Sequence, residues 1–216
     1  MSVSLAKSPV HISIMSGKLA TLKSISTNTL TNKFCLKTHL AKMQSICTFC
    51  YSHSMLAGFR KNAAPALQRN SDLLSSRILK DDEIPTITDK VFRYSAHGEL
   101  INAIHMHNLV LIVEANPNTT FSLWTKRKDI VNKYFDRAIK PSNMIIIYSN
   151  PKISNVMHTV PKGFDKTFNN VLEHELVDEQ NCTGQQCKDC LLCYNHMTTN
   201  VIVEKVKSYG KTKAPS

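Results

Sequence analysis

The sequence contains no uninterrupted apolar run that is long enough to cross a membrane. A membrane-spanning helix needs about 18 or more apolar residues in succession, and no such run occurs among the 216 residues. The chain also contains neither a glycine-rich nucleotide-binding loop nor a Gly-x-Ser-x-Gly nucleophile elbow. We therefore expect no membrane association, and the motifs of two large enzyme classes are missing.

Acidic residues are missing from the first third of the chain. The first is Asp72, and the 71 residues before it carry seven lysines and two arginines. The formal net charge of +11 is therefore mainly an N-terminal property. A basic segment of this kind attracts phosphates, which makes nucleic acid a candidate partner through the N-terminal third. A transit peptide shares this composition, but the segment includes three cysteines that look functional, so we expect a cytoplasmic protein.

The composition is that of a globular protein, with 42% hydrophobic and 20% charged residues. The length fits one domain with a small appendage. We expect a single α/β metal-binding domain over residues 1–207, with a flexible start at 1–15 and a flexible tail at 208–216.

Hydrophobic periodicity predicts alternating strands and helices. Helices are expected at 54–79, interrupted at Pro65, and at 100–115 and 126–139; strands are expected at 91–95, 120–125, 144–148 and 201–206. Such alternation indicates βαβ units around a parallel sheet. We count three or four units, too few for a closed eight-stranded barrel. The expected fold is thus a partial or open parallel (β/α) barrel-like sheet with a C-terminal cysteine-cluster loop.

Seven cysteines, an odd number, cannot all pair within one chain. In a reducing compartment, clustered cysteines indicate metal ligands before disulfides. The densest group is Cys182-x4-Cys187-x2-Cys190-x2-Cys193. Structural zinc usually takes two separated Cys-x2-Cys pairs, whereas closely spaced thiols are typical of ferredoxin-type clusters. The spacing favours iron–sulfur over zinc without excluding zinc.

The second group is Cys35, followed after eleven residues by Cys47-x2-Cys50. Three thiolates would leave one iron of a [4Fe–4S] cluster open for a substrate or cofactor. A closed site would need His39 or His53 as a fourth ligand and would favour zinc. All seven thiols in one shared site are a third alternative.

Several stretches together resemble the phage gene product eighty-eight family, and the resemblance runs over about residues 15–207. They are Ser16-Gly17-Lys18-Leu19, Ser24-Ile25-Ser26-Thr27, Thr31-Asn32 before Cys35, Cys47-Thr48-Phe49-Cys50-Tyr51-Ser52, Arg69-Asn70, Phe92-Arg93 before His97-Gly98-Glu99, Asn116-Pro117 before Phe121, and the terminal cysteines before Val201. Where the family usually has Ser-Gly-Asp, this chain has His97-Gly98-Glu99. The family carries no settled activity, and as a phage protein the chain would work in the host cytoplasm.

A looser similarity links the chain to radical S-adenosylmethionine enzymes. Those enzymes hold a cluster through three cysteines after the first strand, and a Gly-Gly-Glu after the second strand contacts the amino group of the cofactor. The resemblance implies that His97, Gly98 and Glu99 bind the cofactor, although the gap between Cys35 and Cys47 is longer than in those enzymes.

Three functions are therefore weighed. The first is a phage-encoded iron–sulfur protein of radical-enzyme type with one or two [4Fe–4S] clusters, S-adenosylmethionine and an unknown substrate. The second is a zinc-stabilised nucleic-acid-binding protein. The third is a metal-stapled interaction protein in which the cysteines only hold the fold.

Overall fold

A computed structural model describes residues 8–41, 45–175 and 177–206. The strands are β1 (Ser13–Ile14), β2 (Lys23–Ile25), β3 (Val91–Tyr94), β4 (Thr120–Thr125), β5 (Met144–Ile153), β6 (Lys166–Val171) and β7 (Val201–Lys205). The α-helices are α1 (Lys33–Leu40), α2 (Tyr51–Ala57), α3 (Ala64–Ser76), α4 (Ala103–Glu114), α5 (Lys128–Phe135) and α6 (Cys187–Cys190). Single 3₁₀ turns are η1 (Gly17–Leu19), η2 (Lys61–Ala63), η3 (Asp81–Glu83), η4 (Glu173–Glu175) and η5 (Leu192–Tyr194).

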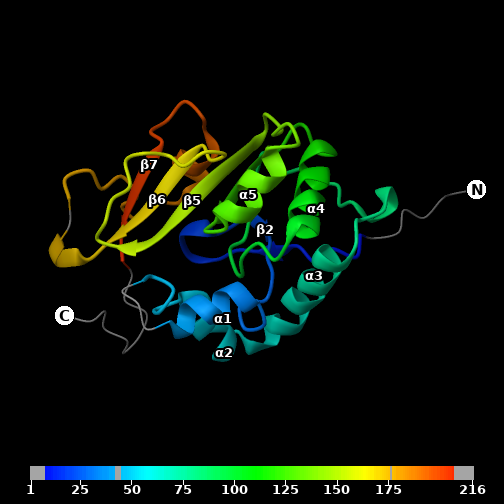
Figure 1. Cartoon of the computed structure of the whole chain (residues 1–216), viewed down its shortest axis with the longest axis horizontal. Coiled ribbons are helices and arrows are strands. Elements are labelled where there is room, and N and C mark those ends of the chain that lie inside the picture. Colours follow the sequence, from blue (N-terminus) through cyan, green and yellow to red (C-terminus); the bar gives the residue numbers. More distant parts are fainter. Residues whose placement is uncertain (1–7, 42–44, 176, 207–216) are drawn as a thin grey trace, which may run out of the picture.

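The strands form one open sheet in the order of the sequence, β1 to β7 (Figure 1). Only β1 runs antiparallel to its neighbour β2; every later pair is parallel. The predicted open, barrel-like parallel sheet is therefore confirmed. Because all parallel strands point the same way, their carboxyl ends share one edge of the sheet, where ligands of such folds bind.

Helices cover one face of the sheet. The residues of β3, β4 and β5 that point to this face, among them Phe92, Phe121 and Ile146, join the main core with Leu109 and Ile112 of α4. In Figure 1, α4 and α5 lie against the sheet, and α1, α2 and α3 gather together at the lower side. The alternation along each strand sends every second side chain to the opposite face.

The opposite face has a smaller core. It contains Ile145, Ile147, Phe168 and Ile202, which the partly buried Trp124, Cys182, Leu192 and Cys193 pack against. Three of these covering residues belong to the loop between β6 and β7. The C-terminal cysteine loop therefore lies over this opposite face, which we call the inner face of the sheet.

Most predicted elements are present with shifted ends. The segment at 54–79 is two helices, because the chain breaks at Gly58 to η2 and Pro65 stands in the first turn of α3, where its missing N–H costs nothing. Helix α5 is shorter than predicted and ends at Phe135, so Ile139 is exposed.

Strand β6 was not predicted. Its Lys-Thr-Phe-Asn-Asn-Val sequence contains three residues that are depleted in strands, one lysine and two asparagines, yet all six residues are buried. Tertiary hydrogen bonds outweigh the propensity: the Asn169 side chain bonds Asn150, Met157 and the main chain of β7. The crossover from β5 to β6 contains no helix, so the alternation that reveals the other units is missing here.

Two expectations fall partly outside the described residues. The predicted tail at 208–216 lies wholly beyond them, as do residues 1–7 of the predicted flexible start. In the part of the start that is described, Val10 is buried in the main core. No helix in the described ranges has the length and apolar character that a membrane span requires.

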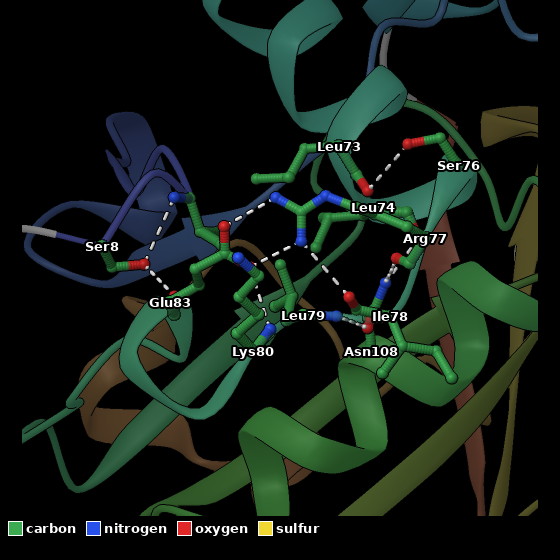
Figure 2. A network of polar contacts seen from close by, with 11 residues as sticks. Ser8, Leu73, Leu74, Ser76, Arg77, Ile78, Leu79, Lys80, Glu83 and Asn108 are labelled. Atoms are coloured by element: carbon green, nitrogen blue, oxygen red, sulfur yellow. Dashed lines mark hydrogen bonds and ion pairs between the residues drawn. The ribbon is translucent and has the colours of Figure 1, made fainter.

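A polar network closes the turn after α3 (Figure 2). The buried Asn108 of α4 accepts a hydrogen bond from the Leu79 amide (2.9 Å) and donates to the carbonyls of Leu74 (2.9 Å) and Arg77 (2.7 Å). Both Nη atoms of Arg77 also donate to Glu83, each at 2.6 Å. One amide side chain thus satisfies three main-chain groups that would otherwise be buried without partners.

We predict that Asn108→Ala lowers the free energy of unfolding by about 3 kcal/mol, because buried polar groups then lose their partners. Urea denaturation measures the change. Asn118→Ala is the matched control, since Asn118 is exposed and a surface substitution should change stability by less than about 0.5 kcal/mol. Equal stability of the two variants would contradict this role of Asn108.

Candidate functional site

A cavity of about 450 Å³ opens at the carboxyl edge of the sheet. This volume lies in the usual range for small-molecule sites, about 300–1,000 Å³. Its lining brings together residues far apart in the sequence. They include Cys35, Cys47, Cys50, His97, Gly98, Glu99, Arg93, Trp124 and Lys126. The three N-terminal thiols and the His97-Gly98-Glu99 motif, predicted separately, therefore face one cavity.

Helix caps position the three thiols. The Asn32 side chain caps α1 by accepting hydrogen bonds from the Phe34 and Cys35 amides, at 3.0 and 3.1 Å. This fixes Cys35 in the first turn. Cys50 is the N-cap residue of α2, and its amide donates to the Cys47 carbonyl (3.3 Å). The turn between them brings Cys47 and Cys50 to the same side.

Glu99 ties the ends of β3 and β4 together. Its carboxylate accepts hydrogen bonds from the Leu100 amide (2.9 Å), the Lys126 amide (2.8 Å) and the Thr125 hydroxyl. Its main-chain carbonyl accepts from the Asn32 side chain (2.9 Å). A carboxylate offers about four lone-pair sites, so one remains for a ligand. Glu99 lines the cavity and is also a structural anchor, and its predicted role in binding a cofactor stays a prediction.

Gly98 is required by close packing. Its φ of +75° lies in the left-handed region, and a Cβ there would meet the Thr27 hydroxyl oxygen at 2.1 Å. Its amide donates to the hydroxyl of Thr29 (2.8 Å). The turn after β3 therefore packs directly against the segment after β2, and this contact brings Glu99 close to the helices that carry the cysteines.

His97 lines the cavity, and most of its side chain is buried. Its Nδ1 lies 2.8 Å from the Ser52 hydroxyl, which in turn lies 2.5 Å from the hydroxyl of Thr29. Burial lowers the pKa of His97 to about 4, and the charges of Arg60 and Arg93 act in the same direction. The imidazole is therefore neutral at pH 7.

Cys35 and Cys50 are protonated in the absence of a metal, because burial raises the pKa of both thiols. The positive charge of Lys126 acts against this on both. Burial lowers the pKa of Lys126 itself, but electrostatic interactions with the nearby Cys47 and Glu99 side chains outweigh burial and raise the pKa. Its ammonium group donates to the Ser149 hydroxyl (2.9 Å). The Lys126 ammonium is thus a cation that would stabilise thiolates at Cys35 and Cys50.

The side chain of Arg93, on β3, is a second cation that lines the cavity. Its guanidinium carbon lies 4.3 Å from the ring centroid of Trp124, the only tryptophan in the chain. Its Nε is buried and has no hydrogen-bond partner among the described residues.

The four C-terminal thiols do not line this cavity. They lie on the loop over the inner face, where Cys193 and Cys182 pack against the smaller core. The pKa values of Cys187 and Cys193 respond to other cysteines of their own group, as that of Cys35 responds to Cys47 and Cys50. This placement favours two separate groups over one shared site.

The chemistry of the donors fits soft thiolate-bound metals at both groups. Across the described part of the chain, however, no three His, Cys, Asp or Glu side chains already surround a common point as metal ligands. Because thiols must lose protons to bind metal, ligand convergence and metal binding are coupled. The metal assignments therefore remain predictions, as does nucleic-acid binding by the basic N-terminal third.

Sequence patterns did not reveal Asn32, Ser52 and Thr29 as site residues. All three are small polar residues after β2 or in α2, and they hold the cysteine helices against the turn after β3. A rule that inspects polar residues just after each parallel strand would have found Thr29 and Asn32, which follow β2 within seven residues.

A protein-family model described as Gene product 88 matches residues 18–180. The chain belongs to the Gene product 88 family. The match contains the three cavity cysteines and His97-Gly98-Glu99, but it ends before Cys182, so the terminal cysteine group lies outside it. Neither curated proteins nor solved structures gave a match.

We predict that the neutral His97 makes stability depend on acid. The unfolded chain takes up this proton near pH 6.5 and the folded chain only near pH 4. The free energy of unfolding therefore falls as the pH drops from 6.5 to 4, by up to about 3 kcal/mol from this residue. Denaturant titrations of His97→Asn between pH 7 and 4.5 should show a shallower loss than the original protein. Burial also lowers the pKa of His105 to about 4. The contribution of His105 to the loss of stability in acid should therefore be the same in the variant and in the original protein. An unchanged pH dependence would show that His97 is not buried as a neutral base.

Proposed function

We propose that this Gene product 88 protein binds an iron–sulfur cluster through Cys35, Cys47 and Cys50 and uses it to reduce a sulfonium cofactor of the S-adenosylmethionine type. The observation that carries the proposal is the shared cavity. Three thiols from the segment after β2 and an acid from the turn after β3 line it together, at the ligand-binding edge of an open parallel sheet.

Three protein thiolates leave one iron of a [4Fe–4S] cluster without a protein ligand, and in such a site the cluster supplies a single electron to the bound sulfonium. This one electron would come from an external low-potential donor through the cluster, and its transfer would break one carbon–sulfur bond of the sulfonium to give a neutral thioether and a carbon-centred radical. The chemistry belongs to the cofactor, and the protein has to bind, orient and shield it.

The residues of the cavity suit these tasks. The Asn32 side chain accepts a hydrogen bond from the Cys35 amide and donates one to the Glu99 carbonyl, so it positions Cys35 relative to Glu99. Glu99 keeps one lone-pair site with which it would accept a hydrogen bond from the cofactor's ammonium group. The cation of Lys126 offsets the negative charge of the thiolates. Apolar lining from Phe34, Phe49 and Met55 keeps water away from a reactive radical.

One observation favours zinc as a second candidate. The rings of His39 and His53 stack with centroids 4.0 Å apart, and both histidines line the cavity. The Nδ1 of His39 lies 2.9 Å from the Cys47 carbonyl. Metal-binding histidines commonly donate one ring nitrogen to such a carbonyl and bind metal with the other. Three thiolates and His39 would make a closed zinc site with a structural role.

Anaerobic reconstitution with iron and sulfide tests the proposal. We expect a brown protein that, after reduction with dithionite, gives a [4Fe–4S] paramagnetic resonance signal and cleaves S-adenosylmethionine. Cys47→Ser should abolish cleavage because a cluster ligand is lost. Cys187→Ser is the matched control and should retain cleavage, because Cys187 lies outside the cavity. A colourless protein that holds zinc at the cavity, with a loss of zinc in His39→Ala, would overturn the iron–sulfur proposal in favour of the second candidate.

A further inference from the structure

The four C-terminal thiols are gathered by a loop with little regular structure. Cys187 and Cys190 stand at the two ends of the four-residue α6, three residues apart, which places them on the same side of one helical turn. Leu191 then takes a left-handed conformation with φ of +53°. This reversal turns the chain so that Cys193 in η5 comes back toward the others. Cys182 lies beside β7, opposite Glu204.

Hydrogen-bond donors surround this group. The ammonium of Lys18 donates to the sulfur of Cys182 (3.2 Å), and the amide of Gln185 donates to the sulfur of Cys190 (3.5 Å). Lys18 also pairs with Glu204. Donors of this kind are typical of the shell around metal-bound thiolates, whose sulfur atoms accept hydrogen bonds.

Two further donors beside the group are buried without partners. The Nε of Arg93 and the hydroxyl of Tyr194 have no hydrogen-bond partner in the described ranges. Both lie near the thiols: Tyr194 follows Cys193 directly, and Arg93 packs on Trp124, which lies against the same small core as Cys182 and Cys193. A buried donor without an acceptor costs about 1–3 kcal/mol. Two such donors beside one group of thiols indicate that a strong acceptor belongs between them.

We propose that Cys182, Cys187, Cys190 and Cys193 bind a second metal centre as four thiolates, and that Arg93 and Tyr194 donate hydrogen bonds to its sulfur atoms. A neutral thiol is a weak acceptor, whereas a metal-bound thiolate carries negative charge and is a strong one. Binding releases the thiol protons to solvent, and the thiolates then satisfy the two donors. Four-thiolate chemistry suits a [4Fe–4S] cluster and zinc alike, so the metal is identified by experiment.

The four thiols of the second centre do not line the cavity, and they lie outside the residues matched by the family model. Arg93 connects the second centre and the cavity structurally, because it also lines the cavity and packs on Trp124. Lys18 lines the cavity as well while it holds Cys182.

Metal analysis of anaerobically purified variants tests the location. In Cys47→Ser/Cys50→Ser, the second centre should remain as iron with sulfide or as zinc, at the stoichiometry of one centre. In Cys187→Ser/Cys190→Ser, this metal should be lost while any metal at the cavity remains. Complete loss of metal in the first variant, or no loss in the second, would overturn the proposal. Because each variant leaves the other group intact, failure here is distinguishable from failure of the proposed function.

Release of metal to a chelator tests the donors. Tyr194→Phe should speed release by about tenfold, since loss of an outer hydrogen bond commonly weakens metal binding 10–100-fold. Tyr134→Phe is the matched control, because its hydroxyl lies 2.8 Å from His107, away from the thiols. Equal release rates in both variants would contradict a donor role for Tyr194.

Discussion

The contacts of Glu99 hold the site together. Its carboxylate joins the ends of β3 and β4 through the Lys126 amide and the Thr125 hydroxyl. Its carbonyl holds Asn32, which caps the helix that carries Cys35. Glu99 therefore links the helix that carries Cys35 to the ends of β3 and β4.

The close approach of Gly98 to Thr27 serves the same end. Because a side chain at this position would push the two turns apart, glycine lets the segments after β2 and β3 meet. The tight contact lies at the ligand edge of the sheet, while the helical face is held by ordinary apolar packing. Constraint at this edge and a generic core elsewhere are what a binding site on a rigid scaffold requires.

Charge follows the same arrangement. The basic character of the N-terminal third suggested phosphate binding, but several of these cations have local tasks. Lys18 pairs with Glu204 and contacts Cys182, and Lys23 pairs with Asp89. Lys126 and Arg93, which come from the nearly neutral remainder of the chain, supply positive charge to the cavity. Thiolate centres carry negative charge, and cations placed beside them lower the cost of burying it.

Much of the fold followed from hydrophobic periodicity, because β3, β4, β5 and β7 are apolar runs between clear breakers. Strand β6 did not follow, because Asn169 and Asn170 are buried only through contacts made by the finished sheet. For the site, spacing identified the cysteines, and the resemblance to radical S-adenosylmethionine enzymes implied a cofactor-binding role for Glu99. The sequence did not predict that the Glu99 carboxylate would accept hydrogen bonds from the scaffold. Two of the donors, the Thr125 hydroxyl and the Lys126 amide, lie at the end of β4 and are far from Glu99 in the sequence. The sequence also left open whether the seven thiols form one shared centre or two. The packing of the terminal loop on the inner face favours two.

The central claim is that the three cavity thiols hold a cluster with one iron open to a ligand. Mössbauer spectroscopy of protein reconstituted with ⁵⁷Fe tests it most directly, using Cys187→Ser/Cys190→Ser to remove the C-terminal ligands. On addition of S-adenosylmethionine, we expect the signal of one iron of the four to shift while the other three stay unchanged. Four irons that do not respond, or no cluster iron at all, would contradict the account.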